Sequence, residues 1–362
     1  MKFRLTVTDD LISFALMMCR QIFVKHLHVT LIVLTLTVGS SFTPVCAAET
    51  IVIDKAKEEG KLVAYLAMNA ADAVTVQASF EKKYPQVKVE LVRMGAPSIL
   101  QRILTEYRGG KVIADVVLGF GFVHYELAQQ KLLARYDSPE RKSYVGQFKD
   151  PAGYWTNVMP IVHTIAYNPK LVANADLPTR YSDLLQPKWQ GKIGLNSNNL
   201  MFLAAMISHF GRDAGIDYLQ KLAGQAPQVR AGGTLLATLV AAGEFPLGLS
   251  INENNVENLK LKGAPVDWLK PADPFYGELV PIGIMAGANH PYASRLFIDY
   301  VLSKEGQELF RNMGKIPARP DVQPKINLDR DKIRMISAEE SARTAYYARL
   351  FDDLFVKRLT VK

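Results

Sequence analysis

Hydrophobic and polar positions between residues 61 and 118 follow strand and helix periods in turn. Short apolar or alternating runs are typical of strands, whereas apolar side chains three or four positions apart indicate helices. The pattern predicts five elements, in the order strand 62–66, helix 76–84, strand 87–91, helix 99–107 and strand 113–118. Strands that alternate with helices favour an α/β fold, an open parallel sheet covered by helices.

Ligands of such sheets bind beyond the carboxyl ends of the strands. The loops that follow the predicted strands are therefore candidate ligand-binding loops, at 67–72, 94–98 and 119–124. The third loop includes Gly119-Phe120-Gly121. Glycines at such positions let a ligand approach the backbone closely, although a tight turn explains them equally well.

A second set of strands and helices occupies residues 165–270, and long extended stretches flank it at 156–167 and 276–285. The simplest topology inserts a middle lobe into an outer lobe, with two strands crossing between them. Such a hinge permits closure around a ligand in the cleft between the lobes. The predicted segments are 48–160 for the first part of the outer lobe, 161–278 for the middle lobe, and 279–362 for the second part of the outer lobe with a C-terminal helix over 338–357.

The first 47 residues have the pattern of an export signal peptide. Basic Arg20 and Lys25 precede an apolar run at 29–36, and small residues follow at Ala47 and Ala48. A positive segment, a short apolar core and a small-residue cleavage site are the three parts of a signal peptide. The apolar run is shorter than the roughly 20 residues that span a bilayer. We therefore predict that residues 1–47 are removed, by cleavage after Ala47 or Ala48, and that the mature protein is periplasmic.

Residues 1–16 contain two aspartates and fit a signal peptide poorly, so we expect translation to start at Met17 or Met18. Both cysteines, Cys19 and Cys46, lie in the segment predicted to be removed. A lipid anchor at Cys46 is disfavoured because the residue before it is bulky. The mature chain would then have no thiol for a disulfide, a nucleophile or a metal ligand.

Composition narrows the function classes. Of the residues, 49% are hydrophobic and 22% are charged, which is typical of a globular protein. The net charge of +8 is dispersed along the chain without a basic run, so we predict no binding to nucleic acid. The sequence has no Gly-x-Ser-x-Gly elbow and no His-Glu-x-x-His helix, so an enzyme is the less favoured alternative.

Several short segments resemble a known family in their order along the chain. They are 58–63, 80–85, 114–117, 166–168, 183–192 and 302–307. With them the chain resembles the extracellular solute-binding proteins of ABC importers, in the branch that includes ferric-ion and sugar-phosphate receptors. The resemblance covers nearly the whole mature chain. It implies a two-lobe type II periplasmic binding fold and delivery of a small-molecule solute to a cognate permease in the inner membrane. We expect a monomer without a cofactor.

A cleft between two lobes would receive loops from both, and these loops give the candidate binding residues. The candidates in the outer lobe are Met68, Asn69, Asp72, Gly119, Phe120, Gly121 and His124. Those in the middle lobe are Asn196, Ser197, Asn198, Asn199, Ser250, Asn252 and Glu253. Those on the crossing strands are His163, Thr164 and Glu278.

The polar run Asn196–Asn199 is the sharpest of these candidates. A polar run before an apolar helix presents free backbone N–H groups and the positive end of the helix dipole to an anionic or carbonyl ligand. The alternative is that these asparagines only cap the helix, and the same holds for Asp72 and Glu253. Phe120 could stack on a flat ligand or pack in the core, and His163 could contact the solute, act as a pH-sensitive latch or lie in the interior.

The resemblance also raises a metal alternative, because ferric receptors share this scaffold. Those relatives supply neighbouring tyrosines in the loop after the strand that here ends at Ser250, but residues 250–255 contain none. If iron were bound by side chains, the candidate ligands would be Asp72, His124, His163 and Glu253. The sequence therefore favours a small polar organic solute, with anionic solutes included, over a ferric ion.

Overall fold

The computed structural model describes residues 44–271 and 273–357. The chain divides into two units, residues 1–51 and 52–362. The predicted translation start and the apolar core of the signal peptide lie outside the described residues and stay predictions. Helix α2 (Pro44–Glu59) begins the described part of the chain. Within the described ranges, no helix has the length and apolar character needed to cross a bilayer.

The predicted alternation of strands and helices at the start of the second unit is confirmed. Its elements are β1 (Lys61–Leu66), α3 (Ala70–Lys83), β2 (Lys88–Arg93), α4 (Ala96–Arg108) and β3 (Val116–Leu118). Strand β1 lies between β2 and β3 and pairs with both in parallel, so that Leu66 is opposite Leu118. The pairing brings the ends of these strands to one edge, as expected for an open α/β sheet.

Two long strands join this part of the sheet to the rest. Strand β5 (Thr156–Tyr167) pairs antiparallel with β10 (Phe275–Met285), which confirms both extended stretches. The register shifts between Val280 and Pro281. Across the described residues the sheet has the order β2-β1-β3-β10-β5-β8-β6-β7. Its remaining strands are β4 (Leu133–Ala134), β6 (Ile193–Asn196), β7 (Gln228–Arg230), β8 (Leu247–Asn252), β9 (Asp267–Trp268) and β11 (Ile333–Ile336).

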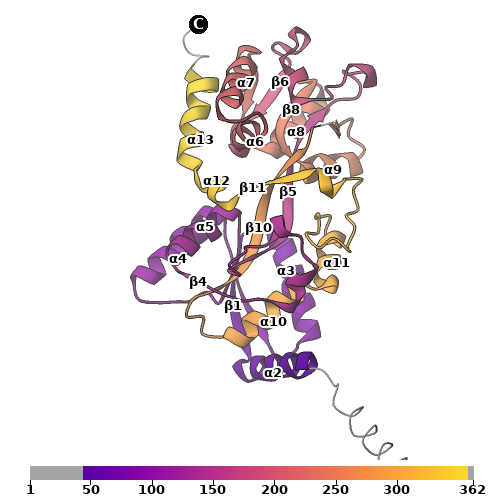
Figure 1. Ribbon diagram of the computed structural model, residues 1–362. Helices are drawn as coiled ribbons and strands as arrows, with labels where there is room; N and C mark the ends of the chain where they lie inside the picture. Colours follow the sequence, from indigo (N-terminus) through magenta and orange to yellow (C-terminus); the bar gives the residue numbers. More distant parts are fainter. Residues whose placement is uncertain (1–43, 272, 358–362) are drawn as a thin grey trace, which may run out of the picture. The chain divides into compact units, whose positions relative to one another are not determined.

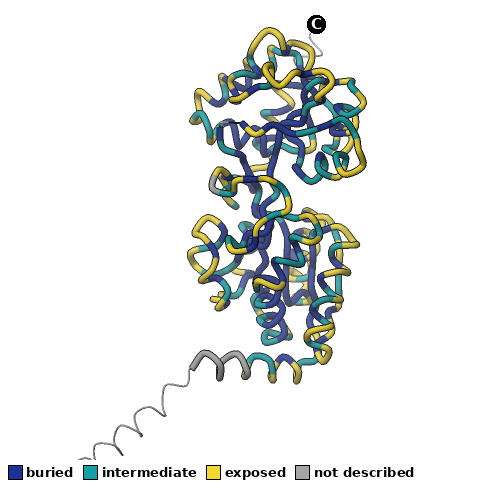
Figure 2. The backbone as a smooth tube through the Cα atoms, turned by 90° about the vertical axis from the view of Figure 1, so that its right-hand side faces the viewer, coloured by how far each residue is buried: buried dark blue, intermediate teal, exposed yellow. Residues whose placement is uncertain are grey.

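Helices cover both faces of this sheet (Figure 1). Beyond those already given, they are α5 (Gly121–Gln129), α6 (Met201–Phe210), α7 (Arg212–Gly224), α8 (Gly233–Ala242), α9 (Glu253–Leu261), α10 (Pro291–Leu302), α11 (Lys304–Asn312), α12 (Ala338–Ala342) and α13 (Thr344–Phe351). The buried residues follow the strands and the inward faces of the helices (Figure 2). On β1, five of six positions are buried, which matches a strand covered on both faces.

The C-terminal segment differs from the sequence prediction in two ways. The predicted single helix over 338–357 is divided into α12, α13 and a π-helical turn at Asp352–Val356. Its buried side chains, including Tyr347 and Phe351, belong to the core cluster of α6 and α7 and not to the core around β1. The sequence predicts that this segment belongs to the outer lobe, whereas its apolar face packs on the elements of the middle segment.

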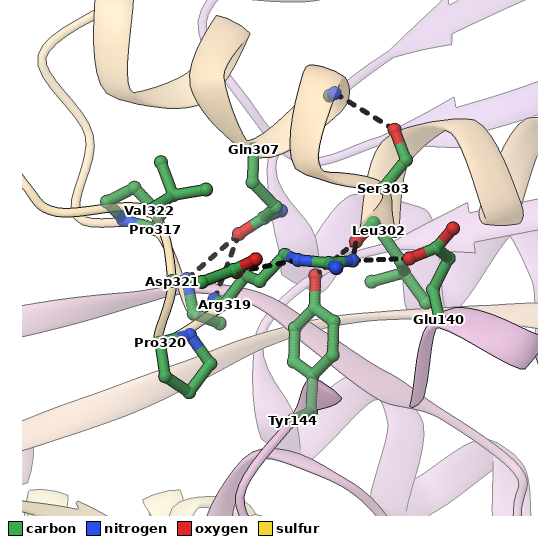
Figure 3. A network of polar contacts seen from close by, with 12 residues as sticks. Glu140, Tyr144, Leu302, Ser303, Gln307, Pro317, Arg319, Pro320, Asp321 and Val322 are labelled. Carbon is green, nitrogen blue, oxygen red and sulfur yellow. Dashed lines mark hydrogen bonds and ion pairs between the residues drawn. The ribbon is translucent and has the colours of Figure 1, made fainter. Parts of the chain in front are cut away.

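A polar network fixes the chain that follows α10 (Figure 3). The side chain of Gln307 is completely buried. Its Nε2 donates to the carbonyl of Val301 (3.1 Å), and its Oε1 accepts from the backbone N–H groups of Ala318 (3.0 Å) and Arg319 (3.3 Å). Arg319 in turn donates to Glu140 and to Asp321. Gln307 therefore bonds three backbone groups, and the N–H of Ala318 also donates to the carbonyl of Val158 (3.2 Å).

Replacing this glutamine should destabilise the fold. Gln307→Ala removes a buried side chain that donates to the carbonyl of Val301 and accepts from the N–H of Arg319, so we expect the free energy of unfolding to fall by about 1–3 kcal/mol. Urea unfolding followed by circular dichroism measures the change. Gln101→Ala, at an exposed position of α4, is the matched control and should change stability by less than about 0.5 kcal/mol. Equal stability of the two variants would contradict this account of the network.

Candidate functional site

A cleft of about 400 Å³ opens where several helices begin. Its walls come from the first residues of α4, α5, α6, α8 and α9, with additions from β6, β10 and the C-terminal segment. The lining residues are Ala96, Pro97, Phe120, Phe122, Asn196, Asn198, Asn199, Leu200, Met201, Gly232, Gly233, Asn252, Asn255, Glu278, Ser341 and Thr344. Among these lining residues, Glu278 has the ionisable side chain.

The helix ends at the cleft differ from several others in this protein. Helices α3, α11 and α12 are capped by the side chains of Asn69, Ser303 and Ser337. At α4, α5, α8 and α9 the N-cap side chain accepts no hydrogen bond. First-turn N–H groups have no partner inside their helix, and the helix dipole adds positive partial charge there. The cleft therefore suits an anionic group.

Asn196 ties three of these loops together. Its side chain is buried, and Nδ2 donates to the carbonyl of Ser250 (3.0 Å). Its Oδ1 accepts from the N–H groups of Asn198 (3.1 Å) and Gly232 (3.1 Å). Ser250 has the left-handed conformation, with φ at 63°, and its hydroxyl donates to the carbonyl of Asn199 (3.2 Å). Asn196 thus positions the wall through one amide N–H and through its Oδ1, which accepts two hydrogen bonds.

A directional chain of hydrogen bonds connects the start of α6 to Glu278. The N–H of Met201 donates to Oδ1 of Asn199 (3.1 Å), so the amide nitrogen of Asn199 must face the other way. That nitrogen donates to Nδ1 of His163 (2.6 Å), and Nε2 of His163 donates to Glu278 (2.8 Å). With Nδ1 as the acceptor in this chain of bonds, Nε2 is the nitrogen of His163 that donates.

Two further asparagines have amides available to a ligand. The side chains of Asn198 and Asn252 line the cleft and make no hydrogen bond to the described residues. Phe120 and Phe122, from the start of α5, add a partly buried aromatic surface. The cleft thus combines free donors with an apolar wall, a combination typical of sites for small organic ligands.

Glu253 and Thr164 lie beside the cleft without lining it. The carboxylate of Glu253 is buried and accepts from the N–H of Val162 (3.0 Å). Burial raises the pKa of Glu253 to about 7 against the lowering effect of this hydrogen bond. The hydroxyl of Thr164 donates to the carbonyl of Ile251 (3.0 Å). Glu253 thus holds the start of α9 against β5, and Thr164 holds β8 against β5.

Most candidates from the first loops have structural partners away from the cleft. Asn69 accepts from the N–H of Asp72 (2.8 Å), and Asp72 forms an ion pair with Lys315 (2.8 Å). Met68 is buried. The N–H of Gly119 donates to the carbonyl of Pro281 (3.1 Å), and Gly121 lies against the C-terminal segment. Outside these loops, the candidate Ser197 likewise has a structural partner, because its N–H donates to the carbonyl of Arg230 (3.0 Å).

The conditional metal ligands do not come together. No group of three or more His, Cys, Asp or Glu side chains that could hold a metal ion occurs in the part of the chain that the structure describes. Of that set, Asp72 is paired with Lys315. His124 is fully buried next to the carbonyl of Val117 (3.3 Å), and burial lowers its pKa to about 4. In this structure these residues form no shared cluster, so a ferric site at them stays a prediction.

The sequence profile of the family described as bacterial extracellular solute-binding protein matches residues 112–339. The chain belongs to this family. The profile extends over most of the sheet and over most of the residues that line the cleft, and it confirms the resemblance found in the sequence. This solute-binding protein therefore shares its scaffold with receptors that capture solutes for import.

Individual relatives agree with this assignment. The chain is 27% identical to an uncharacterized protein of Haemophilus influenzae, over 75% of this chain and 81% of the relative. It is 25% identical to the Fe(3+)-binding periplasmic protein of Serratia marcescens, over 61% of this chain and 64% of the relative. The latter match covers less than two thirds of that relative.

Solved structures show the same fold. The solute-binding protein resembles iron-bound HitA from Pseudomonas aeruginosa with a TM-score of 0.71, at 21% identity over 81% of this chain and 99% of HitA. It resembles AfuA from Actinobacillus pleuropneumoniae, solved with fructose-6-phosphate bound, with a TM-score of 0.66, at 24% identity over 82% of this chain and 99% of AfuA. The predicted type II periplasmic binding fold is confirmed by these likenesses.

Sequence reasoning missed several residues of the cleft in this solute-binding protein. The double glycine at Gly232-Gly233 precedes a helix, which is a signal that could have been used. A Cβ on Gly233 would lie 3.0 Å from Nδ2 of Asn255, so only a glycine fits there without displacing that side chain. Ser341 and Thr344 carry no such signal, because only the folding of the C-terminal segment brings them to the cleft.

The buried carboxyl of Glu253 should make stability depend on pH. Its pKa is higher in the folded than in the unfolded protein, so the folded state binds more protons between about pH 4.5 and 7 and loses stability as the pH rises through this window. Glu253→Gln removes the effect. We expect the stability of this variant relative to the parent to increase by up to about 3 kcal/mol between about pH 5 and pH 8.

Urea unfolding at several pH values measures this difference. Glu58→Gln, at an exposed position of α2, is the matched control and should track the parent at every pH. A stability difference between Glu253→Gln and the parent that stays constant over this pH range would refute the raised pKa of Glu253.

Proposed function

We propose that this protein is the periplasmic receptor of an ABC importer and that it captures a small organic solute with an anionic group. Family membership supports the receptor role. The observation that carries the anionic group is the meeting of uncapped helix starts with the free amides of Asn198 and Asn252 around one cleft. The volume of about 400 Å³ is in the range of small-ligand sites.

Capture proceeds by closure about the two long strands in this proposal. Strands β5 and β10 run between the two groups of elements that supply the cleft walls. A solute drives closure only through its preference for the closed state, and a change from mostly open to mostly closed takes about 5.5 kcal/mol. The closed receptor then delivers its solute to the cognate permease. The Serratia marcescens relative and AfuA are both named as binding proteins, and neither supports an enzymatic role.

Ferric ion is the second candidate, because relatives named above bind iron. Fe(III) prefers anionic oxygen ligands, and the cleft lining offers one carboxylate, Glu278, which is hydrogen-bonded to His163. No tyrosine lines the cleft among the described residues. The geometry therefore supports an organic anion better than a bare ferric ion held by side chains.

Native mass spectrometry of the gently purified protein, compared with its denatured mass, tests this function. We expect an adduct with the mass of a small organic anion. An iron-sized adduct would favour the ferric candidate instead. Where no adduct is retained, a thermal-shift screen of phosphate monoesters, carboxylates, amines and ferric salts decides, and stabilisation by amines or ferric salts alone would contradict the proposal.

Removing the two free amides should weaken solute binding with little effect on folding. Asn198→Ala combined with Asn252→Ala should lower the affinity for the stabilising anion by roughly tenfold per amide, because each loses a hydrogen bond to a charged group. Isothermal titration measures the affinity, and Asn174→Ala, at an exposed position, is the control. Replacement of Asn196 is a poorer test, since it would also release three loops. An unchanged affinity of the double variant would remove these asparagines from the site.

A further inference from the structure

Residues 337–347, which we call the C-terminal strap, contact helices from both sides of the cleft. The strap comprises α12 and the first half of α13. Helix α12 packs on α5 and also touches α6, and α13 packs on α6. Figure 1 shows α12 between α5 and α6, far from both in the sequence. The strap therefore connects two walls that the sheet positions independently.

The contact with α5 is a close backbone approach. A Cβ atom on Gly121 would lie 3.2 Å from Cα of Ala338 and 3.2 Å from Oγ of Ser341. Real Cβ atoms are seldom this close to a backbone atom, so a larger residue at 121 would push the strap away. Ser341 is itself buried. The glycine at position 121 is thus explained by the strap and not by contact with a ligand.

The other end of the strap is anchored in the core. Tyr347 is completely buried in the cluster that includes α6 and α7. Its hydroxyl donates to Glu340, which also pairs with Arg343 (3.3 Å). The guanidinium of Arg343 lies 4.9 Å from the ring centre of Tyr346. These contacts leave the strap fixed at both ends, with its middle over the cleft.

Two hydroxyl groups of the strap line the cleft. The hydroxyl of Ser341 donates to the carbonyl of Ala338 (2.8 Å), and that of Thr344 donates to the carbonyl of Ser341 (3.2 Å). Because each hydroxyl proton is already used, each oxygen remains available as an acceptor. The helix starts on the other walls supply donors. The strap therefore offers hydrogen-bond acceptors. These suit hydroxyl groups of a solute and do not suit its anionic group.

We propose that the strap is a third wall of the solute site, in which Ser341 and Thr344 accept hydrogen bonds from hydroxyl groups of the solute. The strap thereby selects hydroxylated anions over bare ones. This inference rests on the proposed function, since it assigns the part of the solute that does not carry the charge. It also makes the packing of Gly121 on Ala338 a determinant of affinity.

Two probes distinguish the strap from the helix starts: glycerol 3-phosphate, which has hydroxyl groups, and inorganic phosphate, which is the bare anion. Isothermal titration is performed with the parent and with Ser341→Ala combined with Thr344→Val. We expect this double variant to lose at least roughly tenfold in affinity for glycerol 3-phosphate and to bind inorganic phosphate unchanged. Equal losses for both probes, or no loss for either, would overturn the proposal.

A parent protein that binds neither probe would overturn the proposed role of the strap for phosphate esters, and the screen described above then decides on the proposed function separately.

Gly121→Ala gives a second measurement that needs no ligand. It should speed hydrogen exchange of the backbone amides in residues 338–347. The matched control is Gly224→Ala, where a Cβ meets nothing within 4 Å. Unchanged exchange in Gly121→Ala would overturn the close packing on which the third wall depends.

Discussion

The antiparallel pairing of β5 with β10 is the constraint on which the rest of this structure depends. Each strand is long, buried along most of its length and paired on its other edge with a different set of strands. Pairing along both edges gives most of the buried backbone groups of these strands a hydrogen-bond partner. The paired strands β5 and β10 join the two sets of strands from which the cleft helices start. The helix starts meet at the cleft because this pairing fixes the two sets relative to each other.

The cleft shows how little side-chain chemistry a binding site can require. Its donors are largely backbone N–H groups at the starts of helices, supported by amides such as Asn198 and Asn252. The side chain of Asn196 forms hydrogen bonds that hold the loops together. Preorganised backbone donors lose little conformational entropy on binding, since the folded helices already fix them.

The fold could be predicted from the sequence because its signals are local: the apolar runs, the helical spacing and the two extended stretches. The polar run at 196–199 also predicted the place of the cleft. It did not predict which of these residues are structural and which have amides free for a ligand. That Asn196 is a scaffold while Asn198 has a free amide depends on loops more than 30 residues away, at Gly232 and Ser250. The place of Ser341 depends on tertiary packing alone, which no periodicity records.

The hydrogen-bond chain from Met201 to Glu278 runs in one direction, from a backbone donor to a carboxylate. Asn199 and His163 each accept a hydrogen bond from one neighbour and donate one to the next, so neither can be reversed alone. A proton added to Nδ1 of His163 would face the amide nitrogen of Asn199, and both would be donors. Turning the amide to relieve this clash would take the acceptor away from Met201. The direction of each hydrogen bond in this wall of the cleft is therefore fixed by its neighbours.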